Sequence, residues 1–406
     1  MGISYVWIDS LCIVQDDPED WNREAALMIQ IYRYAEFTVA AAVPPTKPDL
    51  GLFRHGDPSD ILSVRLPGVR GPQEDGSGQE IVVMKPQKET YGESPLVSRG
   101  WCFQEREISR RILYYTETQV LWECRTVRAS EGLPNGIPEV EYWSDDEDTP
   151  GDKTWPGRML DNEISSGRVD RSWRRAVEDY SARHLTVFTD KLPALAGLAA
   201  AVRDYKPANC RYLAGLWEND FLEGLQWYSR TGRDGFNEYQ RTITNTRYPE
   251  YVAPTWSWAS VAGPISYVHT SAPESAESAE YALKVLDIHV QTSTNDPFGA
   301  VTHAVLTCTA ALVPGALWAT SSYDYCVKTA DGVSVGVMDF DAPQEKYDRE
   351  GVEVVFCIKF ASIGHGPGLA ILPTGNRENE YRRVGWMESM YWDDSFNTEI
   401  KDITII

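Results

Sequence analysis

The stretch Tyr5-Val6-Trp7-Ile8-Asp9-Ser10-Leu11-Cys12-Ile13-Val14-Gln15-Asp16-Asp17 decides the fold class that we predict from the sequence. Its aromatic and β-branched start predicts a short buried strand that ends at Asp9. Asp17-Pro18-Glu19-Asp20 then predicts the start of a helix, because aspartate caps, proline suits the first helical position and acids favour the positive end. A second strand is expected at Glu36-Phe37-Thr38-Val39-Ala40. Strand, helix and strand in this order predict a βαβ-like unit and an α/β core.

The apolar residues that follow Pro18 recur at helical spacing and predict one buried face of a helix. They are Trp21, Ala25, Met28, Ile29 and Tyr32. Ser98 to Ser109 predicts a short helix. The runs Ile112–Tyr115 and Gln119–Glu123 flank a polar turn and predict a hairpin.

The chain has 406 residues, enough for two or three domains. We predict four parts: residues 1–131 as the α/β core, 132–168 as an acidic Pro/Gly-rich loop or linker, 169–252 as a helical region and 253–406 as a β-rich region. Asp170 to Tyr205 and Leu213 to Tyr228 are expected as helices. Short β-rich runs from Trp256-Ser257-Trp258 onward indicate an antiparallel sheet or sandwich.

The charge balance bears on the class of partner. The formal net charge is -22, with 60 acidic and 38 basic residues, and such a surface repels nucleic acids and anionic membranes. No apolar run reaches the ~20 residues that span a bilayer. The 7 cysteines are scattered without a C-x-x-C pair, which indicates reduced, buried thiols and no zinc site. We therefore expect a cytoplasmic protein.

Three groups of motifs resemble the fungal heterokaryon-incompatibility (HET) family. The first is the opening stretch with Trp21, Glu24, Met28, Ile31-Tyr32 and Ala35. The second is Ser98-Arg99-Gly100-Trp101-Cys102-Phe103-Gln104-Glu105, with Ser109-Arg110-Arg111-Ile112-Leu113 and Trp122-Glu123-Cys124. The third joins Tyr180-Ser181, Asp190–Ala199, Tyr212-Leu213-Ala214-Gly215-Leu216-Trp217 and Ala253-Pro254-Thr255-Trp256-Ser257-Trp258-Ala259-Ser260; Tyr381–Gly385 is also similar to the tail of such proteins.

One departure concerns the start of the resemblance. Family members usually carry a Ser-Tyr-x-Trp-Gly strand some tens of residues before the block that begins here at Tyr5. We therefore expect residues 1–131 to be a HET domain that lacks its usual first strand. A missing strand exposes apolar surface and leaves a sheet edge unpaired.

The resemblance implies non-self recognition and cell-death signalling in a filamentous fungus. It implies an α/β, TIR-like core, a helical segment and a C-terminal β-rich region for regulation. Conformational release or self-association would carry the signal, with protein partners of unknown identity, no nucleic acid and no required cofactor. Trp7, Trp101 and Trp122 are expected in the core.

The HET core is similar to TIR domains, some of which cleave NAD with a glutamate. This resemblance makes Asp9, Glu24 and Glu105 the candidate catalytic acids, with NAD as the cofactor if the alternative of a nucleotide hydrolase holds. Asp9 is expected at a strand end, where α/β sheets place ligands. A carboxylate there would stabilise the oxocarbenium-like state of glycosidic cleavage.

Structural roles are the competing interpretation for each acid. Asp9 would cap the turn that follows it, Glu24 would pair with a core arginine or help frame its helix, and Glu105 would bridge to Arg99, Arg106 or Arg110. For a single acid such roles are several times more frequent than catalysis. An inactive truncated paralogue is the third alternative.

Overall fold

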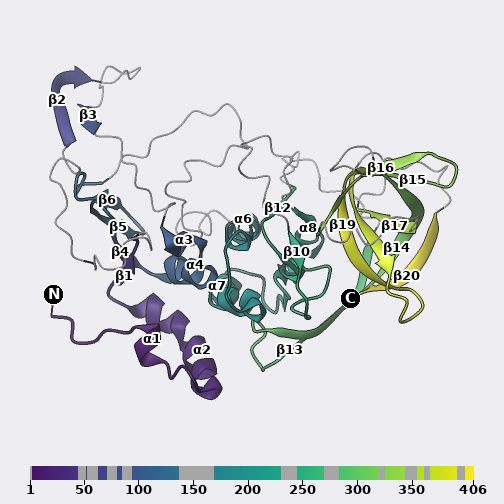
Figure 1. Cartoon of the computed structure of the whole chain (residues 1–406), viewed down its shortest axis with the longest axis horizontal. Coiled ribbons are helices and arrows are strands. Elements are labelled where there is room, and N and C mark those ends of the chain that lie inside the picture. The colour runs from purple at the N-terminus through teal and green to yellow at the C-terminus, as the bar shows by residue number, and fades with distance from the viewer. Residues whose placement is uncertain are drawn as a thin grey trace. The chain divides into compact units, whose positions relative to one another are not determined.

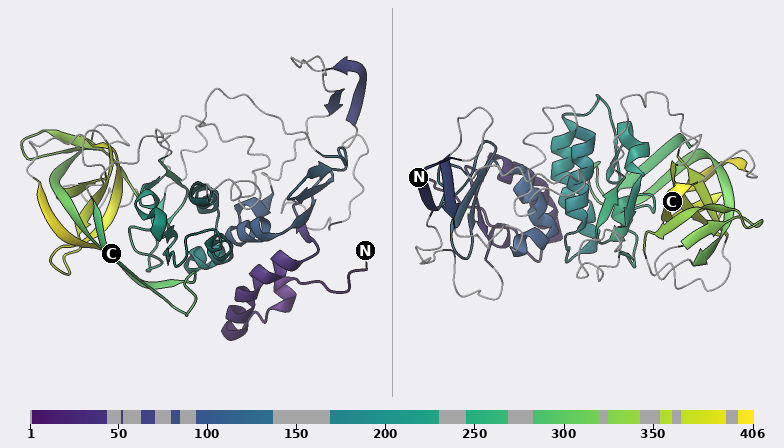
Figure 2. Two further views of the ribbon diagram at one scale, coloured as in Figure 1. Left: turned by 180° about the vertical axis from the view of Figure 1, so that it is seen from behind. Right: turned by 90° about the horizontal axis from the view of Figure 1, so that it is seen from above.

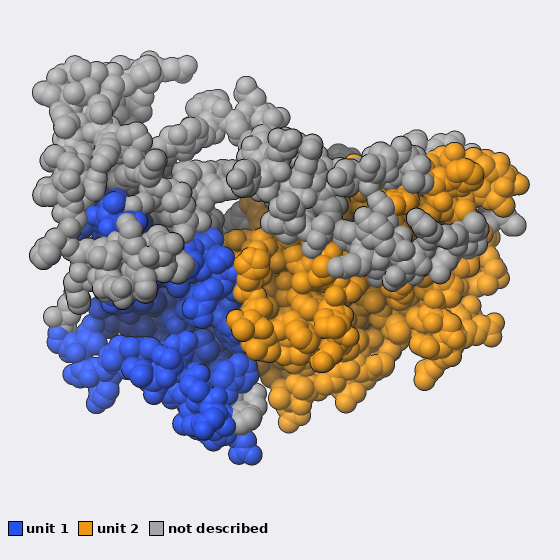
Figure 3. Space-filling view, in the orientation of Figure 1, with its two compact units in different colours: residues 1–167 blue, residues 168–406 orange. Residues whose placement is uncertain are grey.

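The computed structural model describes residues 2–43, 52, 63–70, 80–84, 94–136, 169–229, 245–268, 283–319, 325–342, 354–360, 366–390 and 398–406. The chain divides into two compact units, residues 1–167 and residues 168–406, which Figure 3 colours blue and orange. Most of the predicted acidic linker, from residue 137 to 168, lies outside the described residues. The four-part division of the chain therefore stays a prediction.

The first unit contains a four-stranded sheet in the order β1-β4-β5-β6 (Figure 1). Its strands are β1 (Thr38–Ala41), β4 (Arg111–Tyr115), β5 (Val120–Cys124) and β6 (Arg128–Ser130). β1 runs parallel to β4, and the other pairs are antiparallel. The helices of this unit are α1 (Asp9–Cys12), α2 (Pro18–Tyr34), α3 (Pro95–Ser98) and α4 (Gly100–Ile108), and a separate hairpin joins β2 (Ser63–Arg70) and β3 (Glu80–Met84).

The local signals for helix α2, helix α4 and the β4–β5 hairpin are confirmed. α2 begins at Pro18, and the side chain of Asp17 accepts hydrogen bonds from the backbone N–H groups of Glu19 and Asp20. In the hairpin Tyr115 lies opposite Val120. These elements are set by side chains close to them in the sequence, which is why the pattern predicts them.

The predicted opening strand is wrong. Residues 2–8 form no strand, and Asp9 begins α1 instead of ending a strand. Tyr5 is 92% exposed and Val6 79% exposed. β-prone side chains form a strand only where another strand accepts and donates the ladder hydrogen bonds, and no described strand pairs with this segment. The βαβ unit predicted around α2 is therefore also wrong, and the parallel partner of β1 is β4.

The helical part of the second unit is less regular than predicted. The stretch expected as a helix from Asp170 to Tyr205 contains α6 (Val169–Ser181), the 3-10 turn η5 (Phe188–Lys191) and α7 (Pro193–Arg203). The helix expected from Leu213 to Tyr228 is wrong. That segment contains β7 (Tyr212–Leu213), β8 (Leu216–Trp217), the 3-10 turn η6 (Glu218–Asp220), the single turn α8 (Phe221–Gly224) and β9 (Trp227–Ser229).

The cause of the β7–β8 turn is the backbone of Ala214 and Gly215, whose φ angles are +47° and +99°. A right-handed helix cannot contain either conformation, so the chain reverses there. Further along, β10 (Thr246–Arg247) pairs with β11 (Val261–Ala262), and β12 (Ile265–Tyr267) pairs with β9.

The strand predicted at Trp256-Ser257-Trp258 is wrong, although the predicted packing role of the two tryptophans is confirmed. Ser257 accepts a hydrogen bond from the backbone N–H of Ala259 and caps the 3-10 turn η8 (Trp258–Ser260). Trp256 and Trp258 are both 0% exposed. Burial was therefore predictable here, and the backbone conformation was not.

The C-terminal region is β-rich, as predicted, and it forms a closed barrel (Figures 1 and 2). Its strands are β13 (Lys284–Thr292), β14 (Val301–Ala319), β15 (Tyr325–Lys328), β16 (Ser334–Phe340), β17 (Val354–Lys359), β18 (Gly366–Pro373), β19 (Glu380–Met390) and β20 (Glu399–Ile405). The long strand β14 pairs with β13 and β20 through its first part, and with β15 and β17 through its last part. The ring β14-β15-β16-β19-β18-β17 thus returns to β14, which removes the free edges of an open sheet.

The barrel is filled with apolar side chains, among them Val313, Val335, Met338, Val355 and Met387. Gly368 on β18 allows the neighbouring strands β17 and β19 to approach closely. A Cβ there would lie 2.3 Å from the carbonyl oxygen of Ile358 and 2.2 Å from Sδ of Met390. The described part of the interior is therefore a packed core.

Two expectations about burial need correction. All seven cysteines are free thiols, but only Cys102, Cys308 and Cys357 are buried, and Cys12 is exposed. Trp7, Trp101 and Trp122, expected in the core, are half-buried. In the described part of the chain, no helix combines the length and apolar character that a membrane crossing needs.

Candidate functional site

Aromatic contacts hold the opening segment, α2 and α4 together in the first unit. The rings of Trp21 on α2 and Trp101 on α4 meet edge to face, with centroids 6.0 Å apart. The ring of Trp7 meets that of Tyr32 in the same way at 5.8 Å. These contacts place the first turn of α2 beside α4 and its last turn beside the opening segment.

Asp9 lies at the start of α1 with its side chain exposed. Its Oδ1 accepts a hydrogen bond of 2.7 Å from the backbone N–H of Ser10, as the structural interpretation predicted. The side-chain amide of Gln15 donates to the carbonyl oxygen of Asp9 at 3.3 Å. The turn thus fixes the carboxylate while leaving it accessible.

Glu105 lies half-buried on α4 and accepts a hydrogen bond from the hydroxyl of Tyr32. Burial raises the pKa of the Glu105 carboxyl, and the negative charge of Asp9 raises that pKa further. The Tyr32 hydrogen bond and the positive charge of Arg99 act in the opposite direction. Burial, followed by the charge of Glu105, also raises the pKa of the Tyr32 hydroxyl.

Asp9 and Glu105 therefore lie in one electrostatic neighbourhood, although 96 positions separate 9 from 105 in the sequence. We call Trp7, Asp9, Tyr32, Arg99 and Glu105 the acid cluster. The catalytic role assigned to its two acids remains a prediction.

Glu24, the third candidate acid, lies outside the acid cluster. Its Oε1 is 3.8 Å from Nε of Arg23, and its charge is not among the groups that shift the pKa of Glu105. Eight positions separate Glu24 from Tyr32 on α2, which is about 12 Å along a helix axis. Glu24 thus lies beside an arginine, but the side chain of Arg23 is 62% exposed, so it is not the core arginine that the structural interpretation predicted.

The structure adds three residues that the sequence analysis did not count as site residues: Trp7, Tyr32 and Arg99. Nε1 of Trp7 is buried, and no hydrogen-bond acceptor faces it among the described residues. Tyr32 belonged to the predicted apolar face of α2, and a hydroxyl at the end of such a face is the signal that would have marked it. Arg99 is exposed and precedes the first residue of α4.

A buried ion pair fixes α4 against the sheet. Nη2 of Arg106 lies 2.8 Å from Oε1 of Glu123 on β5, and the hydroxyl of Tyr114 donates to Oε2 of Glu123 at 2.6 Å. Arg106 also contacts Glu107, at 3.4 Å. Arg106 therefore forms its ion pair with Glu123 and not with Glu105, its predicted partner. Because this ion pair fixes α4 on the sheet, the helix that carries Glu105 has a defined orientation.

Two other features of the first unit bear on binding. An open cavity of about 520 Å³ is lined by Gly2, Ile3, Ser4, Tyr5, Glu36, Phe37 and Arg111. None of the three candidate acids lines it. Among the residues that the structure describes, no three His, Cys, Asp or Glu side chains gather as metal ligands would.

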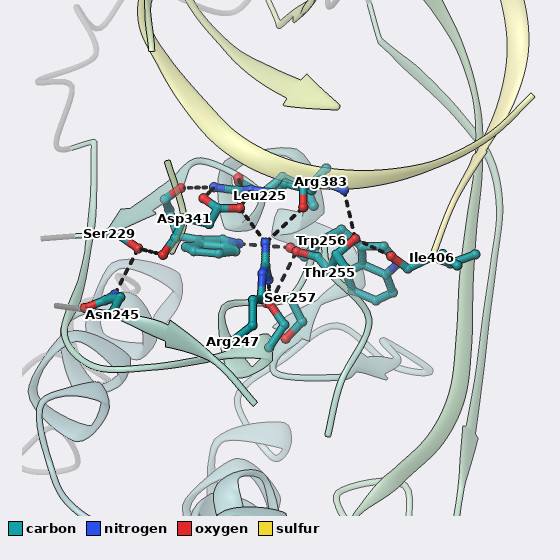
Figure 4. Close-up of polar contacts among 12 residues, drawn as sticks. Leu225, Ser229, Asn245, Arg247, Thr255, Trp256, Ser257, Asp341, Arg383 and Ile406 are labelled. Carbon is teal, nitrogen blue, oxygen red and sulfur yellow. Dashed lines mark hydrogen bonds and ion pairs between the residues drawn. The ribbon is translucent and has the colours of Figure 1, made fainter. Parts of the chain in front are cut away.

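The second unit holds a buried polar centre around Arg383 on β19 (Figure 4). Its Nε and Nη2 donate to the carboxylate of Asp341 at 3.0 and 3.1 Å, and its Nη1 donates to the carbonyl oxygen of Leu225 at 2.8 Å. The guanidinium lies 3.6 Å above the ring of Trp227 and also donates to its carbonyl oxygen. Arg383 and Asp341 are both 0% exposed.

Arg247 and Thr255 extend this centre (Figure 4). Nη2 of Arg247 donates to Asp341 at 3.0 Å, and the backbone N–H of Arg383 donates to Oγ1 of Thr255 at 2.9 Å. The backbone N–H of Thr255 donates to the carbonyl oxygen of Ile406 at 3.0 Å. The centre joins the barrel to the preceding helical part, and its saturated contacts indicate a structural role.

The motifs of the third group converge in the same unit. The carbonyl oxygen of Gly215 accepts hydrogen bonds from Nε1 of Trp173 at 3.1 Å and Nε1 of Trp258 at 3.0 Å. Lys191 lies over the rings of Tyr180 and Trp258, at 5.4 and 5.6 Å from their centroids. Segments that are far apart in the sequence therefore form one core.

The first unit is thus a mixed helix-and-strand domain whose described surface carries two neighbouring acids. Its residues 1–105 match the family model described as "Heterokaryon incompatibility protein (HET)". This match confirms the resemblance to the HET family for the motifs that lie within residues 1–105. No curated protein and no solved structure matches the chain.

Proposed function

We propose that this protein acts in HET-type non-self recognition and that its HET domain triggers cell death in a filamentous fungus. The observation that carries the proposal is the family match over residues 1–105. The convergence of Trp7, Tyr32 and Glu105 supports it, because motifs from two separate blocks pack together.

The partner of this function is a protein. The net charge of -22 disfavours nucleic acid, since a protein must neutralise phosphates to hold them. The signal passes by conformational release or by self-association in the cytoplasm, and neither step requires a cofactor. The C-terminal barrel supplies regulation or partner contacts.

The test is inducible expression of the full chain in a filamentous fungus, with viability counted after induction. We expect loss of viability with the native chain and survival with Phe103→Asp, which places a charge at a side chain only 2% exposed in α4. Val127→Asp, the same change at a site 37% exposed, should kill as the native chain does. Survival with the native chain at normal protein levels would overturn the proposal and favour the inactive paralogue.

The second candidate function is a TIR-like NAD or nucleotide hydrolase. The observation that favours it is the neighbourhood of Asp9 and Glu105, since a half-buried acid beside a second acid is a common arrangement for acid–base chemistry. One carboxylate would stabilise positive charge on the ribose while the other holds a proton or orients hydroxyls.

Release of nicotinamide from NAD by the purified chain tests this second function. We expect Glu105→Gln to abolish release and Glu24→Gln to leave it unchanged, because Glu24 lies outside the acid cluster. No release from the native chain, or equal loss in both variants, would remove the hydrolase and leave the signalling function untouched.

A further inference from the structure

Two histidines are neighbours on the surface of the second unit. His289 on β13 and His303 on β14 are both exposed, and the centroids of their rings lie 6.5 Å apart. The ring planes are tilted by 52°, so the two rings do not stack on each other. Neither histidine belongs to the acid cluster or to the polar centre around Arg383.

The register of the two antiparallel strands fixes this neighbourhood. His289 lies opposite Val305, and His303 lies opposite Gln291. Because side chains alternate between the two faces of a strand, the two histidines share one face and are diagonal neighbours on it. Ile288, which points to the other face, is only 3% exposed. The pair is therefore positioned by a hydrogen-bonded ladder that is anchored from below by the core.

The separation of the rings matches that of two imidazoles that share one metal ion. A zinc–nitrogen bond is about 2.0–2.1 Å long and the nitrogen lies about 1.1 Å from its ring centroid, so the two centroids are about 5 to 6.5 Å apart. The observed 6.5 Å is at the upper end of this range. A small rotation of exposed side chains is enough to bring one nitrogen of each ring onto a common ion.

The chemistry of the pair selects the class of ion. Imidazole nitrogen is a preferred ligand of zinc, copper and nickel. The net charge of -22 attracts cations to the surface. Because no three His, Cys, Asp or Glu side chains gather in the part of the chain that the structure describes, this site has two such ligands, and water fills the other positions.

We propose that His289 and His303 chelate one divalent transition-metal ion of the zinc, nickel or copper class. The ion ties β13 to β14, and its water-filled positions are open to a further ligand. The inference goes beyond the proposed function and does not depend on it, because the two histidines lie outside the residues that match the HET model.

Calorimetric titration of the full chain with zinc chloride tests the site. Exposed thiols are alkylated beforehand, because Cys12 is exposed and thiolates also bind zinc. We expect one saturable site that His289→Ala and His303→Ala each weaken at least roughly tenfold, since each variant leaves a single imidazole. His184→Ala, the same change at another exposed histidine, should leave the affinity unchanged. Absence of saturable binding, or native affinity in both variants of the pair, would overturn the proposal.

Urea denaturation provides a second readout. Because the two ligands lie on different strands, zinc should raise the urea midpoint of the native chain and of His184→Ala, but not of His289→Ala or His303→Ala. Denaturation without zinc should give the same midpoint for all four chains, because the substituted positions are exposed. An equal rise in all four chains would place the zinc elsewhere and contradict the assignment. Cell killing by a chain that binds no zinc would remove this inference and leave the proposed function standing.

Discussion

Asp341 and Arg383 form an ion pair in which two guanidinium nitrogens lie 3.0 and 3.1 Å from the two carboxylate oxygens and neither side chain is exposed. Removal of one partner leaves the other as a buried charge, which costs more than the pair itself contributes. We expect Asp341→Ala to lower the free energy of unfolding by about 3–5 kcal/mol. Urea denaturation measures it, and Asp331→Ala, the same change at an exposed turn, should alter stability little.

Gly215 combines a positive φ of +99° with close contact to Trp258. A Cβ at Gly215 would lie 2.6 Å from Nε1 of Trp258, and so Gly215→Ala adds a clash to the backbone strain. Gly332 shares the positive φ, at +82°, but a Cβ there meets nothing within 4 Å. We expect about 1–3 kcal/mol of destabilisation in Gly332→Ala and roughly 2 kcal/mol more in Gly215→Ala. Equal melting temperatures of the two variants would contradict this account.

The buried amine of Lys191 makes the free energy of unfolding depend on pH in the alkaline range. Burial lowers the pKa of its amine from 10.5 to about 8, so between these values the unfolded chain binds more protons than the folded one. Relative to Lys191→Met, the native chain should therefore gain about 3 kcal/mol of stability as pH increases from 8 to 10.5, at 1.36 kcal/mol per pH unit. Lys191→Met should be more stable than the native chain at pH 7, and this difference should shrink as pH rises.

The control for Lys191 is Lys284→Met, at an exposed position on β13. It should retain the native pH dependence in urea denaturation carried out from pH 7 to 10.5. A native chain whose stability falls over this range relative to Lys191→Met would show that the cation–π contacts with Tyr180 and Trp258 outweigh desolvation.

The sequence predicted what neighbouring residues decide. The cap at Asp17, the proline at the start of α2 and the turn between Tyr115 and Val120 act within a few positions, and these elements formed where expected. The prediction of a strand at Tyr5–Ile8 was wrong because a strand needs a partner strand, and β-prone side chains alone cannot provide one. Closure of the barrel could not be predicted either, since it depends on β14 pairing with both β15 and β17 far along the chain.

The candidate site, too, could be predicted from the sequence only in part, because contacts between distant segments decide it. Motif resemblance selected Asp9, Glu24 and Glu105 together, yet only the packing of α2 on α4 decides which acids are neighbours. The unpaired Nε1 of Trp7 and the hydroxyl of Tyr32 have no sequence signal beyond aromatic residues on an apolar face. Such polar ends of aromatic side chains become informative only once their surroundings are known.

The claim that Asp9 and Glu105 share one site, and that Glu24 lies outside it, is tested most directly by titration of Glu105. Carbon-13 NMR of glutamate-labelled chain would follow the Glu105 carboxyl, assigned by its loss in Glu105→Gln. Because the charge of Asp9 raises the pKa of Glu105, Asp9→Asn should lower that pKa while Glu24→Gln leaves it unchanged. If the pKa of Glu105 stays the same in Asp9→Asn but changes in Glu24→Gln, the account is contradicted.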